Sequence, residues 1–281
     1  MKNQFEHKCG MVSITGLPNA GKSTLINSII NEKVSIVSNK AQTTRNALRG
    51  IFVQGKYQII FIDTPGILKP KSFLNKEMTR SIHNTSDDCD INLYIHDVNN
   101  EILNQKNLTL KNLLKSHKRN FLILNKIDTI SKESLLILSK KLNNFFDFKK
   151  TFMISALKKK GISKLLSVLK KEIPFGSWVY NNNEKTDKNL NFIFSEITRE
   201  KIFQLTNKEI PYAVNINTKK IRKNNQLKIF QEIVIKKESQ KAILIGKKGE
   251  KIKQIGIRAR IDMEKKIKEQ IYLNLMIKVK K

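Results

Sequence analysis

The chain has 281 residues, of which 40% are hydrophobic, and it carries a formal net charge of +30 at pH 7. No run approaches the ~18 apolar residues of a membrane-spanning helix. Its two cysteines provide neither a disulfide framework nor the spacing of a zinc site. The first eight residues lack the apolar segment of a secretion signal, so we expect a cytoplasmic protein. The length of the chain predicts about two domains.

Residues 16–23 fit the pattern G-x-x-x-x-G-K-[ST] of a phosphate-binding loop. A β-rich run (11–15) precedes the loop and a helical run (23–30) follows it, as the motif requires. The glycines allow a tight turn whose N–H groups point at a polyphosphate, Lys22 reaches the β- and γ-phosphates, and Ser23 binds magnesium. The predicted nucleotide-binding residues of this segment are Gly16, Leu17, Pro18, Asn19, Ala20, Gly21, Lys22, Ser23 and Thr24.

A second polar motif follows the apolar run 57–62, which reads as a strand. It consists of Asp63, Thr64, Pro65 and Gly66, all predicted to bind the nucleotide. An aspartate at the end of a buried strand can hold magnesium through water, and a glycine N–H can meet the γ-phosphate. We therefore predict Ser23 and Asp63 as magnesium ligands.

Two further motifs identify the base. Asn125, Lys126 and Asp128 follow the apolar run 121–124, and Ser155 and Ala156 follow the run 151–154. Guanine presents two donors on one edge, and the Asp128 carboxylate can accept both, whereas adenine would leave this charge unpaired. Lys126 can lie along the ring, Asn125 can bond nearby loops and the base, and the Ala156 N–H can donate to the guanine carbonyl. The motifs predict GTP as the ligand.

All four motifs end apolar runs, and the carboxyl ends of parallel strands form the ligand-binding edge of open α/β sheets. We therefore predict a P-loop GTPase domain with a doubly wound sheet over residues 1–175, which ends with a helix at 163–172. A polar segment, 176–190, has the composition of a linker, and we expect Trp178 to anchor it on a domain surface.

A smaller α+β domain is predicted over residues 191–281. In chain order, the pattern indicates a helix at 192–205, strands at 213–217 and 229–235, a short helix from 239, a Gly246–Gly249 loop, a second helix, a further helix at 258–269 and a strand at 271–279. This order is typical of a type II KH domain, and Gly-Lys-Lys-Gly is its RNA-backbone loop. The alternative for the loop alone is an ordinary turn between helices.

The KH interpretation makes the basic residues around this loop candidates for RNA binding. We expect isoleucines at 245, 252 and 255 to form an apolar floor for unstacked bases. The predicted RNA-binding residues are Ile245, Gly246, Lys247, Lys248, Gly249, Lys251, Lys253, Arg258 and Arg260. The net charge of +30 is consistent with a polyanionic partner. It is equally consistent with a bias toward lysine, asparagine and isoleucine in the whole composition.

A GTPase domain followed by this module resembles the Era family of ribosome-assembly GTPases. The resemblance covers nearly the whole chain and rests on the four nucleotide motifs and on the segments 40–45, 195–201, 209–212 and 239–260. It implies a switch that hydrolyses GTP and binds the 3′ end of small-subunit ribosomal RNA. It also implies assistance to assembly of the small ribosomal subunit and peripheral contact with the inner face of the cell membrane. We expect no obligate protein partner.

The resemblance also assigns catalytic roles. Thr44 resembles the switch threonine that joins magnesium, with the adjacent Thr43 as the alternative. Lys22, Thr44 and Gly66 are the expected catalytic residues. Ile67 occupies the position where many GTPases place a water-orienting glutamine, so intrinsic hydrolysis should be slow. Asn19 resembles a residue that binds potassium near the phosphates in related GTPases; its alternative role is to stabilise the loop.

Two other functions remain open from the sequence. The first is an RNA chaperone with little hydrolysis, which the intact Lys22, Asp63 and Asp128 argue against. The second is a membrane-surface GTPase regulator whose lysines contact anionic lipid.

Overall fold

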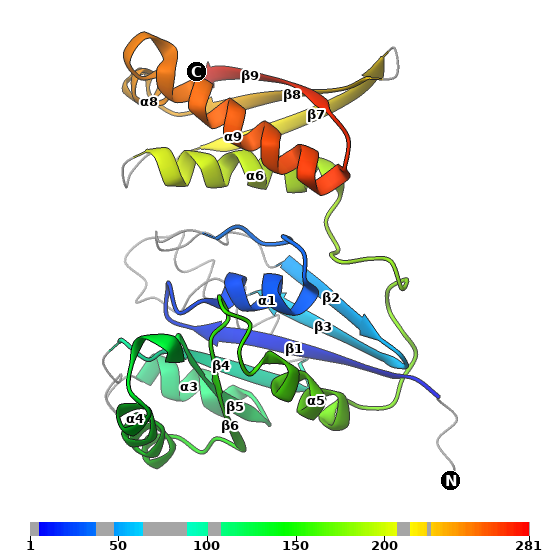
Figure 1. The fold of residues 1–281 in the computed structure, drawn as a ribbon, viewed down its shortest axis with the longest axis vertical. Helices are drawn as coiled ribbons and strands as arrows, with labels where there is room; N and C mark the ends of the chain where they lie inside the picture. The colour runs from blue at the N-terminus through cyan, green and yellow to red at the C-terminus, as the bar shows by residue number, and fades with distance from the viewer. Residues whose placement is uncertain are drawn as a thin grey trace. The chain divides into compact units, whose positions relative to one another are not determined.

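A computed structural model of the chain describes residues 6–37, 48–63, 89–100, 108–206, 214–223 and 226–280. The chain forms two compact units, which are drawn in Figure 1. The first unit contains Met1–Ser35 and Ala41–Asp187, and the second contains Ile36–Lys40 and Lys188–Lys281. Among the described helices, none combines the length and the apolar character needed to cross a membrane.

The first unit is built on a six-stranded sheet with the order β2-β3-β1-β4-β5-β6. Strand β2 is antiparallel to β3, and the other neighbours are parallel. Every residue of β4 and β5 is buried, as expected for strands covered on both faces. The strands are β1 (Lys8–Gly16), β2 (Leu48–Gln54), β3 (Tyr57–Asp63), β4 (Ile91–Asp97), β5 (Asn120–Asn125) and β6 (Lys150–Ile154).

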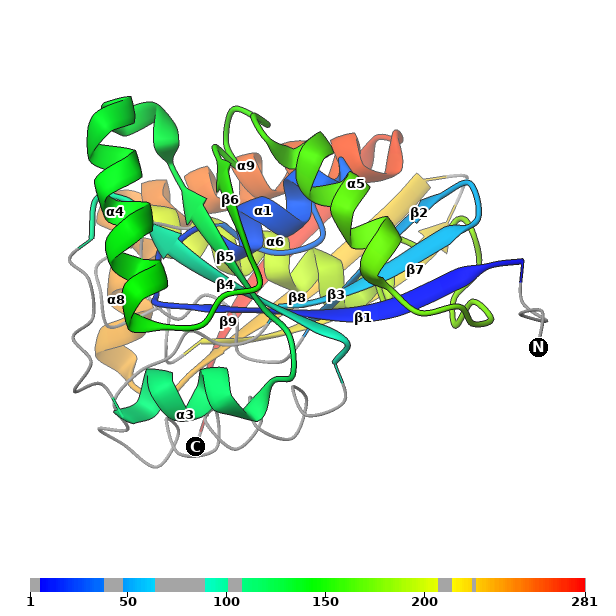
Figure 2. The ribbon, with the colours of Figure 1, turned by 90° about the horizontal axis from the view of Figure 1, so that it is seen from below.

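Helices cover both faces of this sheet. They are α1 (Lys22–Ile30), α3 (Leu108–Ser116), α4 (Lys132–Phe145) and α5 (Ile162–Glu172). One apolar cluster joins Tyr94, Leu122 and Leu124 of the strands to side chains of α3 and α4. On the other face, a Cβ at Gly50 would lie 2.7 Å from Ile26 of α1, so this helix packs directly on the strand backbone. Figure 2 shows α1 and α5 on one side of the strands and α3 on the other. This is a doubly wound sheet.

The second unit has a three-stranded sheet, β7-β8-β9, in which β8 is antiparallel to β7 and parallel to β9. Its elements in chain order are α6 (Leu190–Leu205), β7 (Asn215–Lys223), β8 (Gln226–Ile235), α8 (Glu238–Ile245), a 3-10 turn (Lys247–Gly249), α9 (Glu250–Ile267) and β9 (Ile271–Val279). Two apolar clusters fill the space between sheet and helices. The order of helices and strands agrees with the predicted type II KH domain.

One sequence-based expectation for this unit was wrong. We expected two helices after the Gly246–Gly249 loop, with a break near Gly256, but α9 is a single helix. Its buried residues, Ile255, Ala259 and Met263, recur every four positions along one face. This packing holds the helix through Gly256, although a glycine inside a helix costs about 1 kcal/mol relative to alanine. A Cβ at Gly256 would lie 3.5 Å from the side chain of Leu275 of β9, which is an ordinary van der Waals contact.

The segment predicted as a linker packs against the first unit up to Asp187. The N–H of Ile51 donates to the carbonyl of Lys185 over 2.9 Å, beside the edge strand β2. The side-chain amide of Gln58 donates to the carbonyl of Tyr180 over 2.7 Å. The ring of Trp178 meets His7 edge to face with 5.1 Å between ring centroids, so Trp178 anchors this segment as expected.

Candidate functional site

The phosphate-binding loop connects the carboxyl end of β1 to α1 and lies against residues of β4 and β5. Gly16 and Gly21 adopt φ values of 152° and 100°, which disfavour residues with a side chain. A Cβ at Gly21 would lie 2.2 Å from Nδ2 of Asn125, and one at Gly16 would lie 2.4 Å from the carbonyl oxygen of Ile95. The turn therefore depends on glycine at both positions, for space as well as for conformation.

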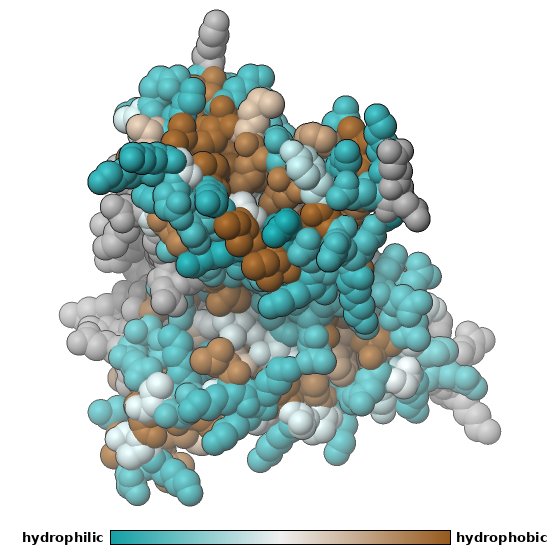
Figure 3. All heavy atoms as spheres, turned by 45° about the horizontal axis from the view of Figure 1, so that its top comes forward, coloured by the Kyte–Doolittle hydropathy of each residue, from teal (hydrophilic) through white to brown (hydrophobic). Residues whose placement is uncertain are grey.

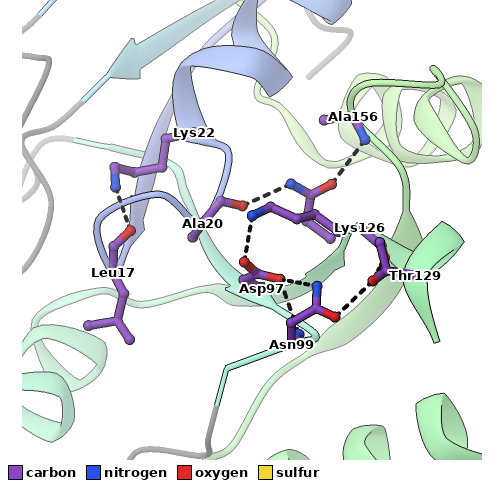
Figure 4. Close-up of polar contacts among 9 residues, drawn as sticks. Leu17, Ala20, Lys22, Asp97, Asn99, Lys126, Thr129 and Ala156 are labelled. Carbon is purple, nitrogen blue, oxygen red and sulfur yellow. Dashed lines mark hydrogen bonds and ion pairs between the residues drawn. The ribbon is translucent and has the colours of Figure 1, made fainter. Parts of the chain in front are cut away.

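Lys22 begins α1 and is almost fully buried. Its ammonium group donates to the carbonyls of Gly16, over 3.1 Å, and Leu17, over 2.9 Å; Figure 4 shows the second bond. Burial lowers the pKa of Lys22 to about 8, and the negative charge of Asp63 partly opposes this shift. Polyphosphate oxygens would offer the ammonium group stronger partners than these carbonyls. The position is therefore suited to an anionic ligand.

Asp63, at the end of β3, is fully buried between two hydroxyl groups. Its Oδ2 accepts a hydrogen bond from Ser23 over 2.9 Å and another from Ser35 over 2.8 Å. The predicted magnesium ligands Ser23 and Asp63 are thus in contact. Their oxygens are the type of ligand that magnesium prefers, so this pair fits the ion. Ser35 belongs to no motif, and nothing in the sequence marks it as a member of the site.

Asn125, at the end of β5, connects two loops of the site. Its side-chain Nδ2 donates to the carbonyl of Ala20 over 2.8 Å, and its Oδ1 accepts from the Ala156 N–H over 2.9 Å. The predicted bonding of Asn125 to nearby loops is confirmed. The Ala156 N–H, which we expected to meet the guanine carbonyl, has this partner within the protein. Its bond to the base stays a prediction.

Asp128 carries the carboxylate predicted to read the base. A hydrogen bond from the Ser155 hydroxyl, followed by the interaction with Lys158, holds the pKa of Asp128 below its usual value. The Lys158 ammonium lies 3.2 Å from Oδ2 of Asp128. The carboxylate is therefore ionised at neutral pH, as it must be to accept two donors from a guanine edge.

Asp97, which ends β4, is a member of the site that sequence reasoning missed. Its Oδ2 lies 2.5 Å from the Lys126 ammonium, and its Oδ1 accepts from the N–H and the side-chain amide of Asn99, as Figure 4 shows. Burial opposes ionisation of Asp97, but the bonds from Lys126 and Asn99 outweigh it and hold its pKa below the usual value. The sequence contained a pattern that could have identified Asp97, because this residue follows an apolar run as Asp63 does.

Several predicted residues lie outside the described part of the chain. These are both switch threonines, Thr43 and Thr44, and the residues after Asp63, namely Thr64, Pro65, Gly66 and Ile67. Their roles stay predictions. The described residues of the phosphate loop, of β3 and of the two base motifs meet at one edge of the sheet, as expected.

The Gly246–Gly249 loop of the second unit connects α8 to α9. Gly246 and Gly249 have φ values of 71° and 79°. A Cβ at Gly249 would meet no atom within 4 Å, so a ligand backbone could approach it closely. Lys247 and Lys248 are both exposed, and Lys248 itself adopts a positive φ of 49°. The loop therefore presents two cations beside bare backbone, as an RNA-backbone site requires.

The other predicted RNA-binding residues differ in exposure. Lys253, Arg258 and Arg260 are exposed on α9, whereas Ile245 and Lys251 are partly buried. The expected apolar floor was wrong in one member, because Ile255 is fully buried in the core between helices and sheet. A continuous helix turns Ile255 inward with Ala259, while it leaves Ile257 exposed.

Comparisons with known proteins agree with both halves of this description. A family described as 50S ribosome-binding GTPase matches residues 11–126, and a KH domain family matches residues 209–281. The chain is 40% identical to GTPase Era of Staphylococcus epidermidis over 278 residues, which cover 98% of this chain and 93% of the relative. It is 38% identical to GTPase Era of Brucella suis biovar 1 over 275 residues, which cover 97% and 88%.

Two solved structures share the complete fold. One is a variant of Aquifex aeolicus Era bound to GDP and aluminium fluoride, with a TM-score of 0.92 and 34% identity over 97% of this chain and 94% of that one. The other is Era in complex with MgGDPNP and nucleotides 1506–1542 of 16S ribosomal RNA. It has a TM-score of 0.92 and 33% identity over 98% of this chain and 94% of that one. The predicted fold class is thereby confirmed.

Proposed function

The chain belongs to the GTPase Era family, and we propose that this GTPase is a switch that binds small-subunit ribosomal RNA and assists assembly of the small ribosomal subunit. The observation that carries the proposal is the presence, in one chain, of a guanine-nucleotide site and an exposed basic G-x-x-G loop. The first unit supplies the switch. The second unit supplies the contact with RNA, and the nucleotide state decides how long it lasts.

The described residues have distinct roles in nucleotide binding. Asp128 accepts the two donors of the guanine edge, and Lys126 flanks the ring from its contact with Asp97. Lys22 neutralises charge on the β- and γ-phosphates. Ser23 and Asp63 would hold magnesium, which would supply positive charge beside the phosphates. A relative's complex with MgGDPNP supports magnesium and a guanine nucleotide as the ligands.

We propose potassium as an additional cation near the phosphates. Asn19 supports this proposal, because it lies exposed in the phosphate loop with a positive φ of 63°. A bound cation would supply charge stabilisation where Ile67 offers no hydrogen bond to the attacking water. The test is the rate of GTP hydrolysis in potassium chloride and in sodium chloride at equal ionic strength. We expect the faster rate in potassium, and equal rates would leave Asn19 with a structural role alone.

The proposed RNA target is the single-stranded 3′ end of small-subunit ribosomal RNA. A relative of this chain was crystallised with nucleotides 1506–1542 of that RNA, which supports the choice. The deciding experiment is crosslinking of the protein to RNA in cells, followed by sequencing, with wild type and with the Lys22→Ala variant. We expect wild-type crosslinks concentrated near the 3′ end and lost when nucleotide binding is lost. Crosslinks spread evenly over ribosomal RNA in both proteins would contradict the proposal.

We also propose that the protein is cytoplasmic and contacts the inner face of the membrane at its periphery. The high positive charge supports this contact, because lysines near an anionic surface each contribute about 1 kcal/mol. Sedimentation with anionic vesicles, with and without competing RNA, tests it. Absence of vesicle binding at physiological salt would exclude the contact.

A further inference from the structure

One face of the β7-β8-β9 sheet carries the core of the second unit, and the opposite face is open among the described residues. Strand β8 alternates strictly: Ile229 and Ile233 are fully buried under the helices, whereas Phe230 between them is 38% exposed. The pairing of β8 with β7 and β9 places alternate residues of all three strands on the same open face. We call this surface the outer sheet face. It shares no element with the G-x-x-G loop.

The outer sheet face exposes large apolar side chains, two of which are aromatic. Phe230 and Tyr272 lie with their ring centroids 6.4 Å apart. Tyr272 is 46% exposed and Met276 is 60% exposed, which are high values for such side chains. In Figure 3, hydrophobic residues of the second unit gather on the surface turned toward the viewer, among hydrophilic ones. The apolar residues at alternate positions of this face are Ile221, Phe230, Val234, Tyr272 and Met276.

The outer sheet face is also strongly basic. Four lysines occupy its alternate positions, Lys219, Lys223, Lys228 and Lys278, and a fifth, Lys280, directly follows β9. The sole carboxylate in the described residues of the three strands is Glu232, and its Oε1 lies 3.2 Å from the Lys278 ammonium. The Lys228 ammonium lies 6.0 Å from the centre of the Tyr272 ring. Positive charge therefore surrounds the aromatic pair.

A shallow hollow lies beside the Phe230 ring. It has a volume of about 260 Å³ and is lined by Phe230, Met276, Asn217, Asn274 and Lys219, among others. A neighbouring hollow shares Asn217 and Glu232 with it and continues toward Lys278 and Lys280. The asparagine side chains in its lining offer both donors and acceptors, so the hollow could hold a flat polar ring.

We propose that the outer sheet face is a second binding surface for single-stranded RNA, separate from the G-x-x-G loop. Exposed rings on the middle and edge strands of a sheet can stack bases, and surrounding lysines can follow the phosphates. An apolar protein partner would not need the five lysines, and an acidic partner would not need the exposed ring pair. A single strand uses both, because its bases are flat and its backbone is anionic. The proposal adds to the proposed function and does not depend on the loop.

The test is the affinity of the full-length protein for a fluorescently labelled 12-nucleotide single-stranded RNA. Removal of two stacking rings in Phe230→Ala/Tyr272→Ala should weaken binding at least tenfold, because each stacked base is worth about 1–3 kcal/mol. The matched control is Leu136→Ala/Ile137→Ala, which removes two exposed apolar side chains from α4 of the first unit. The control should bind RNA as wild type does, and GTP affinity should be unchanged in both proteins.

A protein that carries both Phe230→Ala/Tyr272→Ala and Lys247→Asp/Lys248→Asp distinguishes the contribution of the outer sheet face to RNA affinity from that of the G-x-x-G loop. If each pair of substitutions weakens binding and their effects on affinity multiply, both surfaces contact RNA. If only the loop variant loses affinity, the outer sheet face does not bind RNA, the present proposal is overturned, and the proposed function stands. That outcome would leave the face to a protein partner.

A second measurement covers the case in which the aromatic variant does not fold. Wild-type protein is photo-crosslinked to the same RNA carrying 5-iodouridine, which reacts with aromatic rings in contact with it, and the modified peptides are mapped. Crosslinks to Phe230 or Tyr272 support the proposal. Crosslinks confined to the region of the G-x-x-G loop overturn it.

Discussion

The ammonium nitrogen of Lys126 lies 2.5 Å from Oδ2 of Asp97, across the neighbouring ends of β4 and β5. Lys126 adopts a positive φ of 67°, a conformation that is uncommon for a residue with a side chain. The carboxylate therefore fixes the direction of a lysine that flanks the guanine site. Asn99 completes the arrangement, because it donates to Asp97 and accepts from Thr129.

We expect Asp97→Asn to weaken binding of GDP and GTP by about tenfold, since a hydrogen bond to a charged group is worth about 1.5–3 kcal/mol. The preference for guanine should remain, because Asp128 is unchanged. Fluorescence titration with labelled GDP measures the effect. Asp147→Asn is the control, because it removes an exposed carboxylate of the same unit. Equal affinities of the two variants would show that the contact with Asp97 has no part in nucleotide binding.

Asp128→Asn should reverse the choice of base. An amide at this position offers a donor as well as an acceptor, and xanthine replaces the amino donor of guanine with a carbonyl acceptor. We expect weaker binding of GTP, by about a hundredfold or more, because the site loses the acceptor that pairs with the guanine donors, and tighter binding of XTP. Competition between the two nucleotides for the variant gives the answer. A variant that still prefers GTP would contradict the assignment of the base-reading carboxylate.

Nucleotide binding should take up a proton at alkaline pH. The pKa of Lys22 is about 8 in the structure, so above pH 8 much of the free protein carries a neutral amine there. Contact with phosphates favours the ammonium form and raises this pKa. Affinity for GDP should therefore be constant below pH 8 and fall by up to about tenfold per pH unit above it. Calorimetry at pH 9 in two buffers of different ionisation enthalpy measures the uptake. No uptake would mean that Lys22 stays charged in the free protein.

Replacement of Lys247 and Lys248 by aspartate should weaken binding of single-stranded RNA by at least ~10-fold, because two phosphate contacts are lost. For the same reason, the slope of log K against log salt concentration should decrease in magnitude by about 1.4. Gly246 and Gly249 stay in place, so the fold should survive. Aspartate also tolerates the positive φ of position 248. Affinity for GTP should be unchanged, because the loop belongs to the second unit.

The control for this variant is Lys140→Asp/Lys141→Asp, two exposed lysines of α4. Both proteins have the same net charge, so they separate a local site from the bulk charge of the chain. If the two variants lose RNA affinity equally, the charge of +30 accounts for binding and the G-x-x-G loop has no specific role.

Local sequence was sufficient to predict which residues lie at the ligand-binding edge of the sheet in the first unit. Each nucleotide motif directly follows an apolar run, and parallel strands end at a common edge, so the order of motifs predicts their meeting. Helix and strand order in the second unit followed in the same way from hydrophobic periodicity. The prediction of a helix break at Gly256 was wrong, because burial of one helix face outweighs the low helix propensity of a single glycine.

The sequence by itself determined which chemical groups are available for binding. These are the phosphate loop and the Asp128 carboxylate for the nucleotide, and the two lysines of the G-x-x-G loop for RNA. Only the tertiary structure decided which other residues hydrogen-bond to the residues of the nucleotide site and position them. Asn125 joins Ala20 to Ala156, and Asp63 meets Ser35, across separations of 28 to 105 residues. No local pattern encodes such pairs, because the partners are chosen when the strands and loops that carry them pack together. The same packing decided that Ile255 belongs to the core and that Phe230 and Tyr272 remain outside it.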